Sequence, residues 1–97
     1  MKGIHQGKNN DLKSLCQAIL KLKNSEEVRD FLRDLMTVEE ITEISKRWQA
    51  ARLLDQKISY RQVAVKTGLS TTTVARVAHW LYHGTGGYQL VLKRLKA

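Results

Sequence analysis

The segment from residue 70 to residue 83 carries hydroxyl, guanidinium and imidazole side chains at helical spacing. Threonine hydroxyls can donate to phosphates or bases, and the threonine methyl group can pack on thymine. Arginine can make two parallel hydrogen bonds to a guanine or a phosphate. The side chains that recur every three to four residues would share one exposed stripe of a helix: Thr72, Arg76, His79 and His83. The stripe is suited to contacts with a nucleic acid; the alternative is that the threonines only cap a helix.

A pattern of small and apolar residues places this stripe on the second helix of a helix-turn-helix. Ala64 is small enough for two helices to cross closely, and Gly68 would supply the left-handed backbone of the short turn between them. The inner faces would pack together through Val63, Leu69, Val74 and Val77. The pattern predicts a helix-turn-helix over about residues 60–82, with Ser70 as the N-cap of the recognition helix.

The distribution of charge favours a polyanionic partner. The chain has 97 residues and a formal net charge of +8, from 17 basic and 9 acidic side chains. Residues 1–55 contain all nine acidic side chains, whereas residues 56–97 contain seven basic side chains and no acidic one. Such a surface attracts DNA and displaces its condensed counterions. We expect Arg61 and Lys66, on the helix before the turn, to hold the phosphate backbone.

Apolar residues recur at spacings of three and four and the chain has no proline, which predicts helices almost throughout. These helices must position the groups described above. Residues 1–10 are predicted to form a flexible arm, and residues 11–97 a single helical domain. The first predicted helix has its apolar stripe at Leu12, Leu15, Ile19 and Leu22. The second begins at Asn24 or Ser25 and should bury Val28, Phe31, Leu32 and Leu35.

The rest of the chain continues this all-α pattern. Thr37 and Glu40 fit a capping box ahead of a third helix that ends near Gln56 or Lys57. A short helix from about Tyr60 to Thr67 precedes the recognition helix. Residues 84–87 form a glycine-rich joint, and a last helix follows. The third helix has one apolar face, made of Ile41, Ile44, Trp48, Ala51 and Leu54.

Several classes of function are not expected. Cys16 is the single cysteine, which suits the reducing cytoplasm, and its apolar neighbours predict a small buried side chain. No apolar run approaches the ~18 residues of a membrane span, and the N-terminus lacks a secretory signal, so we expect a cytoplasmic protein without a membrane partner. No nucleophile–base pair, acid pair or cofactor loop predicts an enzyme. His79 and His83 lack a third ligand nearby, so no metal site is predicted.

With these residues established, the chain resembles the tryptophan repressor superfamily, and within it the YerC/YecD branch. The resemblance covers roughly residues 12–92 and rests on RDLMT at 33–37, KR at 46–47, YRQVA at 60–64, KTGLSTTTVARV at 66–77 and GY at 87–88. It implies six helices and an intertwined homodimer built from the N-terminal helices. A dimer agrees with the first three helices, which are more apolar than a lone chain of this size needs.

The resemblance also assigns roles to individual residues. Thr71, Thr72 and Ala75 match recognition-helix positions that face the major groove, and Arg61 matches a phosphate contact. In the tryptophan-responsive members, an indole lies between two arginines, beside a glycine and a serine. The equivalents in this chain are Arg47, Arg76, Val77 and Trp80, with valine in place of the glycine and tryptophan in place of the serine.

These two replacements change what the pocket can hold. A close-packed interior does not accept a second aromatic ring without expelling the first. We therefore expect that the chain does not bind free tryptophan, and that Trp80 fills the equivalent cavity from within.

The sequence as a whole predicts a DNA-binding transcriptional regulator, a repressor, that binds a near-palindromic operator as a homodimer. Two recognition helices would enter successive major grooves, about 34 Å apart. The expected DNA-binding residues are Arg61, Lys66, Ser70, Thr71, Thr72, Thr73, Ala75, Arg76 and His79. The rival interpretation is a helical protein–protein interaction module that uses the same surface. No cofactor is predicted, and any small-molecule effector is left open.

Overall fold

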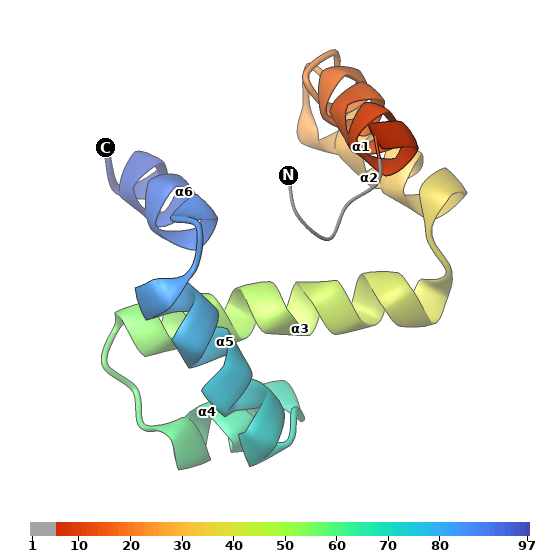
Figure 1. Cartoon of the computed structure of the whole chain (residues 1–97). Coiled ribbons are helices and arrows are strands. Elements are labelled where there is room, and N and C mark those ends of the chain that lie inside the picture. The colour runs from red at the N-terminus through yellow and green to blue at the C-terminus, as the bar shows by residue number, and fades with distance from the viewer. Residues whose placement is uncertain (1–5) are drawn as a thin grey trace. The chain divides into compact units, whose positions relative to one another are not determined.

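The computed structural model of the chain describes residues 6–97, and Figure 1 shows its helices in order. Within these residues there are six α-helices and no strand, so the predicted all-α fold is confirmed. The helices are α1 (Gln6–Ile19), α2 (Ser25–Leu35), α3 (Val38–Asp55), α4 (Tyr60–Thr67), α5 (Thr71–His83) and α6 (Gly87–Lys96). None of these helices combines the length and the apolarity that crossing a bilayer requires. The chain separates into two compact units, one ending at Val38 and one formed by Glu39–Ala97.

Helix α1 starts earlier than the sequence pattern predicts. Its first residue is Gln6, so residues 6–10, which were expected to belong to a flexible arm, are helical. A polar composition does not by itself prevent a helix: Gln6 and Lys8 favour one, although Gly7, Asn9 and Asn10 do not. The remainder of the predicted arm, residues 1–5, lies outside the described residues.

The start of α2 is fixed by two hydrogen bonds that involve Glu27. The Asn24 side-chain oxygen accepts from the Glu27 backbone N–H at 2.9 Å. In turn, the Glu27 carboxylate accepts from the Lys23 backbone N–H at 2.9 Å. These bonds satisfy N–H groups that have no partner inside the helix. The predicted start at Asn24 or Ser25 is confirmed, with Asn24 as the N-cap.

The N-terminal unit leaves its apolar side chains accessible. From Asn9 to Val38 no residue is buried, although Phe31 and Leu32 are partly covered. Val28 is 38% exposed and Leu35 is 51% exposed, so the predicted burial of the α2 stripe does not occur within this chain. Cys16 is also exposed, contrary to the expectation of a buried thiol. Two short helices offer too little surface to enclose a core of their own.

The C-terminal unit contains the hydrophobic core. Figure 1 shows α5 crossing α3, and one cluster of buried side chains joins α3, α4, α5 and α6. Its members are Ala50, Ala51, Leu54, Val63, Leu69, Val74, Val77, Ala78, Leu81 and Leu92. The predicted packing of Leu69, Val74 and Val77 in the same core as Val63 is confirmed. The core thus fixes which face of α5 points inward.

Two polar contacts hold α6 in place within this unit. Lys96 Nζ lies 2.6 Å from Asp55 Oδ2, which joins the end of α6 to the end of α3. The Gln89 side-chain amide donates to the backbone carbonyl of Leu81 at 2.9 Å, which joins α6 to α5. Helix α6 therefore has defined neighbours on both α3 and α5.

Candidate nucleic-acid interface

The turn between α4 and α5 is built by one glycine and one threonine. Gly68 ends α4 in the left-handed conformation, with φ 77° and ψ 6°, and its N–H donates to Ala64 O at 2.9 Å. The sequence pattern predicted this role for Gly68. It did not single out Thr67, whose buried hydroxyl donates to Val63 O at 2.7 Å and accepts from Leu69 N–H at 3.2 Å. Thr67 thereby satisfies a backbone donor in the turn that would otherwise be buried without a partner.

The serine and threonine side chains at the start of α5 divide into two groups. Ser70 Oγ accepts from the Thr73 backbone N–H at 3.1 Å and donates to Thr73 Oγ1 at 3.0 Å. Ser70 is therefore the predicted N-cap, and both hydroxyls are engaged in the first turn of the helix. Thr71 and Thr72 lie in the same turn and are exposed. Within this cluster the hydroxyls of Ser70 and Thr73 are engaged with each other, whereas Thr71 and Thr72 are the more exposed candidates for contacts with a nucleic acid.

Helix α5 presents an outer surface of the predicted kind. Its inner face is 98% buried or more at Val74, Val77, Ala78 and Leu81. The outer residues Thr72, Ala75, Arg76 and His79 are all exposed. This one-sided burial is what a recognition helix needs in order to enter a groove.

The two histidines of α5 lie close together on the surface. The His79 ring centroid is 5.5 Å from that of His83, and 5.4 Å from that of Trp80 in an edge-on arrangement. Across the part of the chain that the structure describes, no three His, Cys, Asp or Glu side chains are grouped as a metal site would require.

Basic side chains flank the turn. Arg61 and Lys66 are exposed on α4 and line one shallow hollow of about 410 Å³. Lys66 also shares a hollow of about 380 Å³ with Lys46 of α3. The Lys46 ammonium is close enough to Gly68 to lie 3.7 Å from a Cβ built there. Lys46 is thus a third cation at the turn. In the sequence, only its place in the KR pair at 46–47 pointed to it.

Two acidic side chains of α3 are paired with basic ones. Glu43 Oε2 lies 3.3 Å from Arg47 Nε, and Asp55 is paired with Lys96. Helices α4 and α5 contain no acidic residue. The surface around the turn is therefore cationic without local compensation, which favours phosphate groups.

The four residues equivalent to an effector pocket do come together. Arg47, Arg76, Val77 and Trp80 line a hollow of about 360 Å³, together with Thr73 and Tyr88. The prediction that Trp80 fills this space from within is wrong, because its side chain is 58% exposed. Val77 and Leu81 already occupy the inward positions of α5, so the indole lies at the surface instead.

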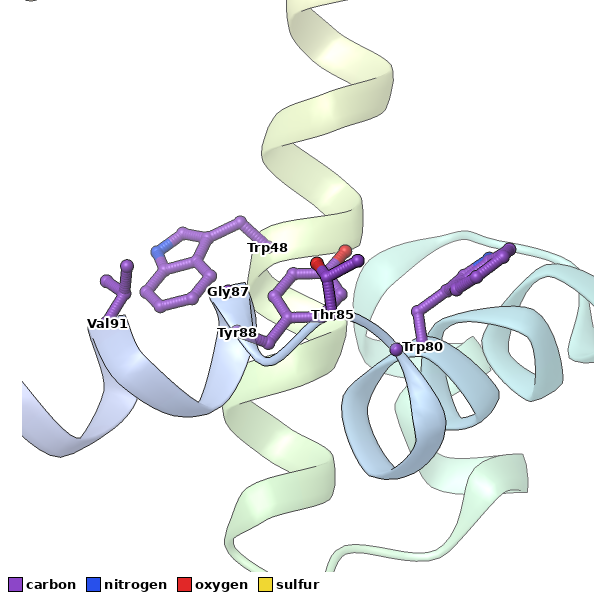
Figure 2. Close-up of a pocket in the computed structure, with 7 residues that line it drawn as sticks. Trp48, Trp80, Thr85, Gly87, Tyr88 and Val91 are labelled. Atoms are coloured by element: carbon purple, nitrogen blue, oxygen red, sulfur yellow. The ribbon is translucent and has the colours of Figure 1, made fainter. Parts of the chain in front are cut away.

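A second hollow adjoins the first and was not predicted. It has a volume of about 630 Å³ and lies among Trp48, Trp80, Thr85, Tyr88 and Val91, with Gly84 and Gly87 (Figure 2). Trp48 and Tyr88 are stacked, with ring centroids 6.3 Å apart and planes at 16°. The sequence pattern placed Trp48 in the core and residues 84–87 in a joint. The sequence features that could have pointed to this hollow are the two tryptophans and the tyrosine that follows the glycines.

Comparison with known proteins places this geometry in a family. The Trp repressor protein family matches residues 10–96. The uncharacterized protein YerC of Bacillus subtilis is 36% identical over 93 residues, which cover 96% of this chain and 89% of YerC.

Two solved structures share the fold. A TrpR-like protein from Eubacterium eligens has a TM-score of 0.85 and 40% identity, over 90% of each chain. A proposed Trp repressor from Staphylococcus aureus has a TM-score of 0.85 and 38% identity, over 90% of this chain and 87% of that one. The resemblance inferred from the residues is confirmed: the chain belongs to the Trp repressor protein family.

Proposed function

We propose that this protein is a cytoplasmic transcriptional regulator, a repressor. It binds a near-palindromic operator as a homodimer and does not use tryptophan as a corepressor. One observation carries the proposal: α5 buries one face in the core and exposes the opposite face, which carries Thr72, Ala75, Arg76 and His79. Arg76 supplies the guanidinium for a guanine or a phosphate, and Thr71 and Thr72 lie in the first turn, where recognition helices contact bases.

The cations at the turn supply affinity in this proposal. Arg61 and Lys66 are exposed on α4, and Lys46 reaches the turn from α3. Contacts between such groups and phosphates fix the register of a protein on the duplex but carry little sequence information. The acid-free composition of residues 56–97 supports this role.

The homodimer is supported by the apolar surface of the N-terminal unit. Leu12 is 50% exposed, Leu20 is 81% exposed and Leu35 is 51% exposed. Apolar side chains that a chain leaves uncovered are typical of surfaces that a second chain covers. A dimer would also supply the two recognition helices that a near-palindromic operator requires.

The absence of a tryptophan response is supported by the hollow between Arg47 and Arg76. Val77 puts a buried isopropyl group where the resemblance places a glycine, and Trp80 replaces a serine hydroxyl with an indole. The ligand would lose the close approach to the helix backbone that a glycine permits and the hydrogen bond that a serine hydroxyl offers. We expect calorimetry with L-tryptophan to show no binding at micromolar concentrations, and micromolar binding would contradict this part.

The test of DNA recognition begins with selection of bound duplexes from a random pool. We expect a symmetric site with half-sites about one helical turn apart. Affinity for that site is then measured over a range of salt concentrations for the wild type and for substituted proteins. Arg61→Gln should lower the slope of log affinity against log salt by about 0.9 for each phosphate that the protein no longer neutralises. Thr72→Val should change the preferred bases and leave the slope unchanged.

The matched control is Arg29→Gln. Arg29 is an exposed arginine of α2 that lies 3.8 Å from Asp30 and belongs to the N-terminal unit. Its replacement removes one positive charge without touching α4 or α5, and the slope should stay at the wild-type value. A wild-type protein that ignores duplex DNA in dilute buffer, or an Arg29→Gln slope that falls as far as that of Arg61→Gln, would refute the proposed interface.

A further inference from the structure

Helix α5 carries a row of basic side chains that extends well beyond its first turn. Arg76, His79 and His83 follow one another at spacings of three and four residues, and all three are exposed. The ring centroids of His79 and His83 are 5.5 Å apart. Within residues 6–97, neither imidazole takes part in an ion pair. Both rings are therefore available to a charged partner from outside the chain.

The length of α5 determines what these rings can meet on a duplex, a step that rests on the proposed function. Helix α5 has 13 residues and is thus about 20 Å long, whereas the major groove is only about 12 Å wide. His79 comes eight residues after Thr71, which is about 12 Å further along the helix axis. When the first turn of α5 contacts base edges, the segment from His79 onward lies beyond the groove and over the phosphate backbone.

We infer that His79 and His83 bind backbone phosphates of the duplex in their protonated form, which makes the binding of DNA dependent on pH. Histidine is the side chain whose ordinary change of charge falls between about pH 5 and pH 8. A protonated imidazole donates from both nitrogens, and a phosphate oxygen accepts such charge-assisted hydrogen bonds. A neighbouring phosphate favours the charged form of the ring, so protons are taken up when the duplex binds.

The charges around α5 leave this role to an external polyanion. Helices α4, α5 and α6 contain no acidic residue, and Glu43 and Asp55 of α3 are each paired with a basic side chain. Glu39 and Glu40 lie in the first turn of α3, whereas the buried contacts of α3 begin at Ala50. The other charged or titratable side chains on the elements next to α5 are Lys46 and Arg52 of α3, Lys57 of the loop after it, Tyr60, Arg61 and Lys66 of α4, and Tyr88, Lys93 and Arg94 of α6. None of them supplies a carboxylate, so positive charges in the row repel one another until phosphates compensate them.

The sign of the pH dependence follows from the uptake of protons. Protons that bind together with the duplex favour the complex at low pH, so affinity for DNA should rise as the pH falls from about 8 to about 6. Exposed ionic contacts are worth little individually, and two of them should raise affinity by about three- to twentyfold. Each protonated ring that neutralises a phosphate should also make the slope of log affinity against log salt steeper by about 0.9.

The experiment measures binding of the full-length protein to a random-sequence duplex at about pH 6 and about pH 8, over a range of salt concentrations. A random sequence suffices, because phosphate contacts carry no base information. We expect the wild type to bind more tightly at the lower pH, with the steeper salt slope. The double variant His79→Gln, His83→Gln keeps two exposed polar side chains that cannot be protonated. It should lose most of the difference between the two pH values, in affinity and in slope.

His5→Gln is the matched control, because His5 is the third histidine of the chain and lies outside the described residues. Its replacement removes one imidazole and should leave the wild-type pH dependence in place. A pH dependence that survives undiminished in the double variant, or that disappears with His5→Gln, would overturn the inference.

Failure of this inference differs from failure of the proposed function. A wild type that binds the duplex equally at both pH values overturns the role of the imidazoles and leaves the proposed interface intact. A wild type that binds no duplex at either pH, even in dilute buffer, refutes the proposed function as well.

Discussion

Gly68→Ala tests the turn on which the position of α5 depends. Gly68 has φ 77°, a region where an L-residue costs about 1–2 kcal/mol. A Cβ at this position would meet only the Lys46 ammonium at 3.7 Å, an ordinary contact with the flexible end of a side chain. Steric overlap thus adds little, and the effect is backbone strain. Alanine also restricts the unfolded chain, which offsets about 0.4–1 kcal/mol.

The expected net loss of stability is about 1 kcal/mol, which corresponds to a fall in Tm of roughly 4–8 °C for a domain of this size. The measurement is thermal unfolding followed by circular dichroism. All variants are compared at one chain concentration, because association shifts the apparent Tm. Gly68→Asn should lose less than Gly68→Ala, because asparagine tolerates the left-handed conformation better.

Gly87→Ala is the control with the opposite expected sign. Gly87 is the first residue of α6, and nothing lies within 4 Å of a Cβ built there. Alanine at this position should be neutral or stabilising by about 0.4–1 kcal/mol. The explanation from backbone strain is refuted if Gly68→Ala melts with the wild type, or if Gly87→Ala loses as much as Gly68→Ala.

Three further substitutions test the core and the turn by urea unfolding at a fixed chain concentration. Leu81 is 2% exposed, so Leu81→Ala should lower the free energy of unfolding by about 2–5 kcal/mol. A loss under about 1 kcal/mol would show that neighbouring side chains fill the cavity. Thr67→Val should cost about 1–3 kcal/mol because the Leu69 N–H loses its acceptor, whereas Thr67→Ser keeps the hydroxyl and should recover most of the loss. Ser70→Ala should cost about 1 kcal/mol through loss of the cap, and a change confined to DNA affinity would contradict that role.

The helix-turn-helix could be predicted closely because its signals are local. The bounds of α4, the left-handed Gly68 and the Ser70 cap all follow from the chemistry of single residues and their near neighbours. The inner face of α5 also followed from helical periodicity, since Val74 and Val77 are buried as expected. Within α4, the turn and α5, the spacing of residues in the sequence is enough to predict which side chains are buried and which residues cap the helices.

The errors share a different cause. Helical spacing identified the apolar stripe of α2, but it could not tell whether this chain or another one covers Val28 and Leu35. The exposed Trp80 was misplaced because its surroundings depend on how α5, α6 and the loop between them pack, which involves residues far from it in sequence. The start of α1 was set too late because polar residues signal exposure to solvent and not the end of a helix.

The opposite faces of α5 have independent roles, and this has an evolutionary consequence. Val74, Val77, Ala78 and Leu81 anchor the helix, whereas the residues that face outward make no contribution to the core. Under the proposed function, mutations at Thr72 or Ala75 would therefore alter target choice while leaving the melting behaviour intact. A duplicated copy of such a gene can acquire a new set of targets through very few changes, without first having to gain stability.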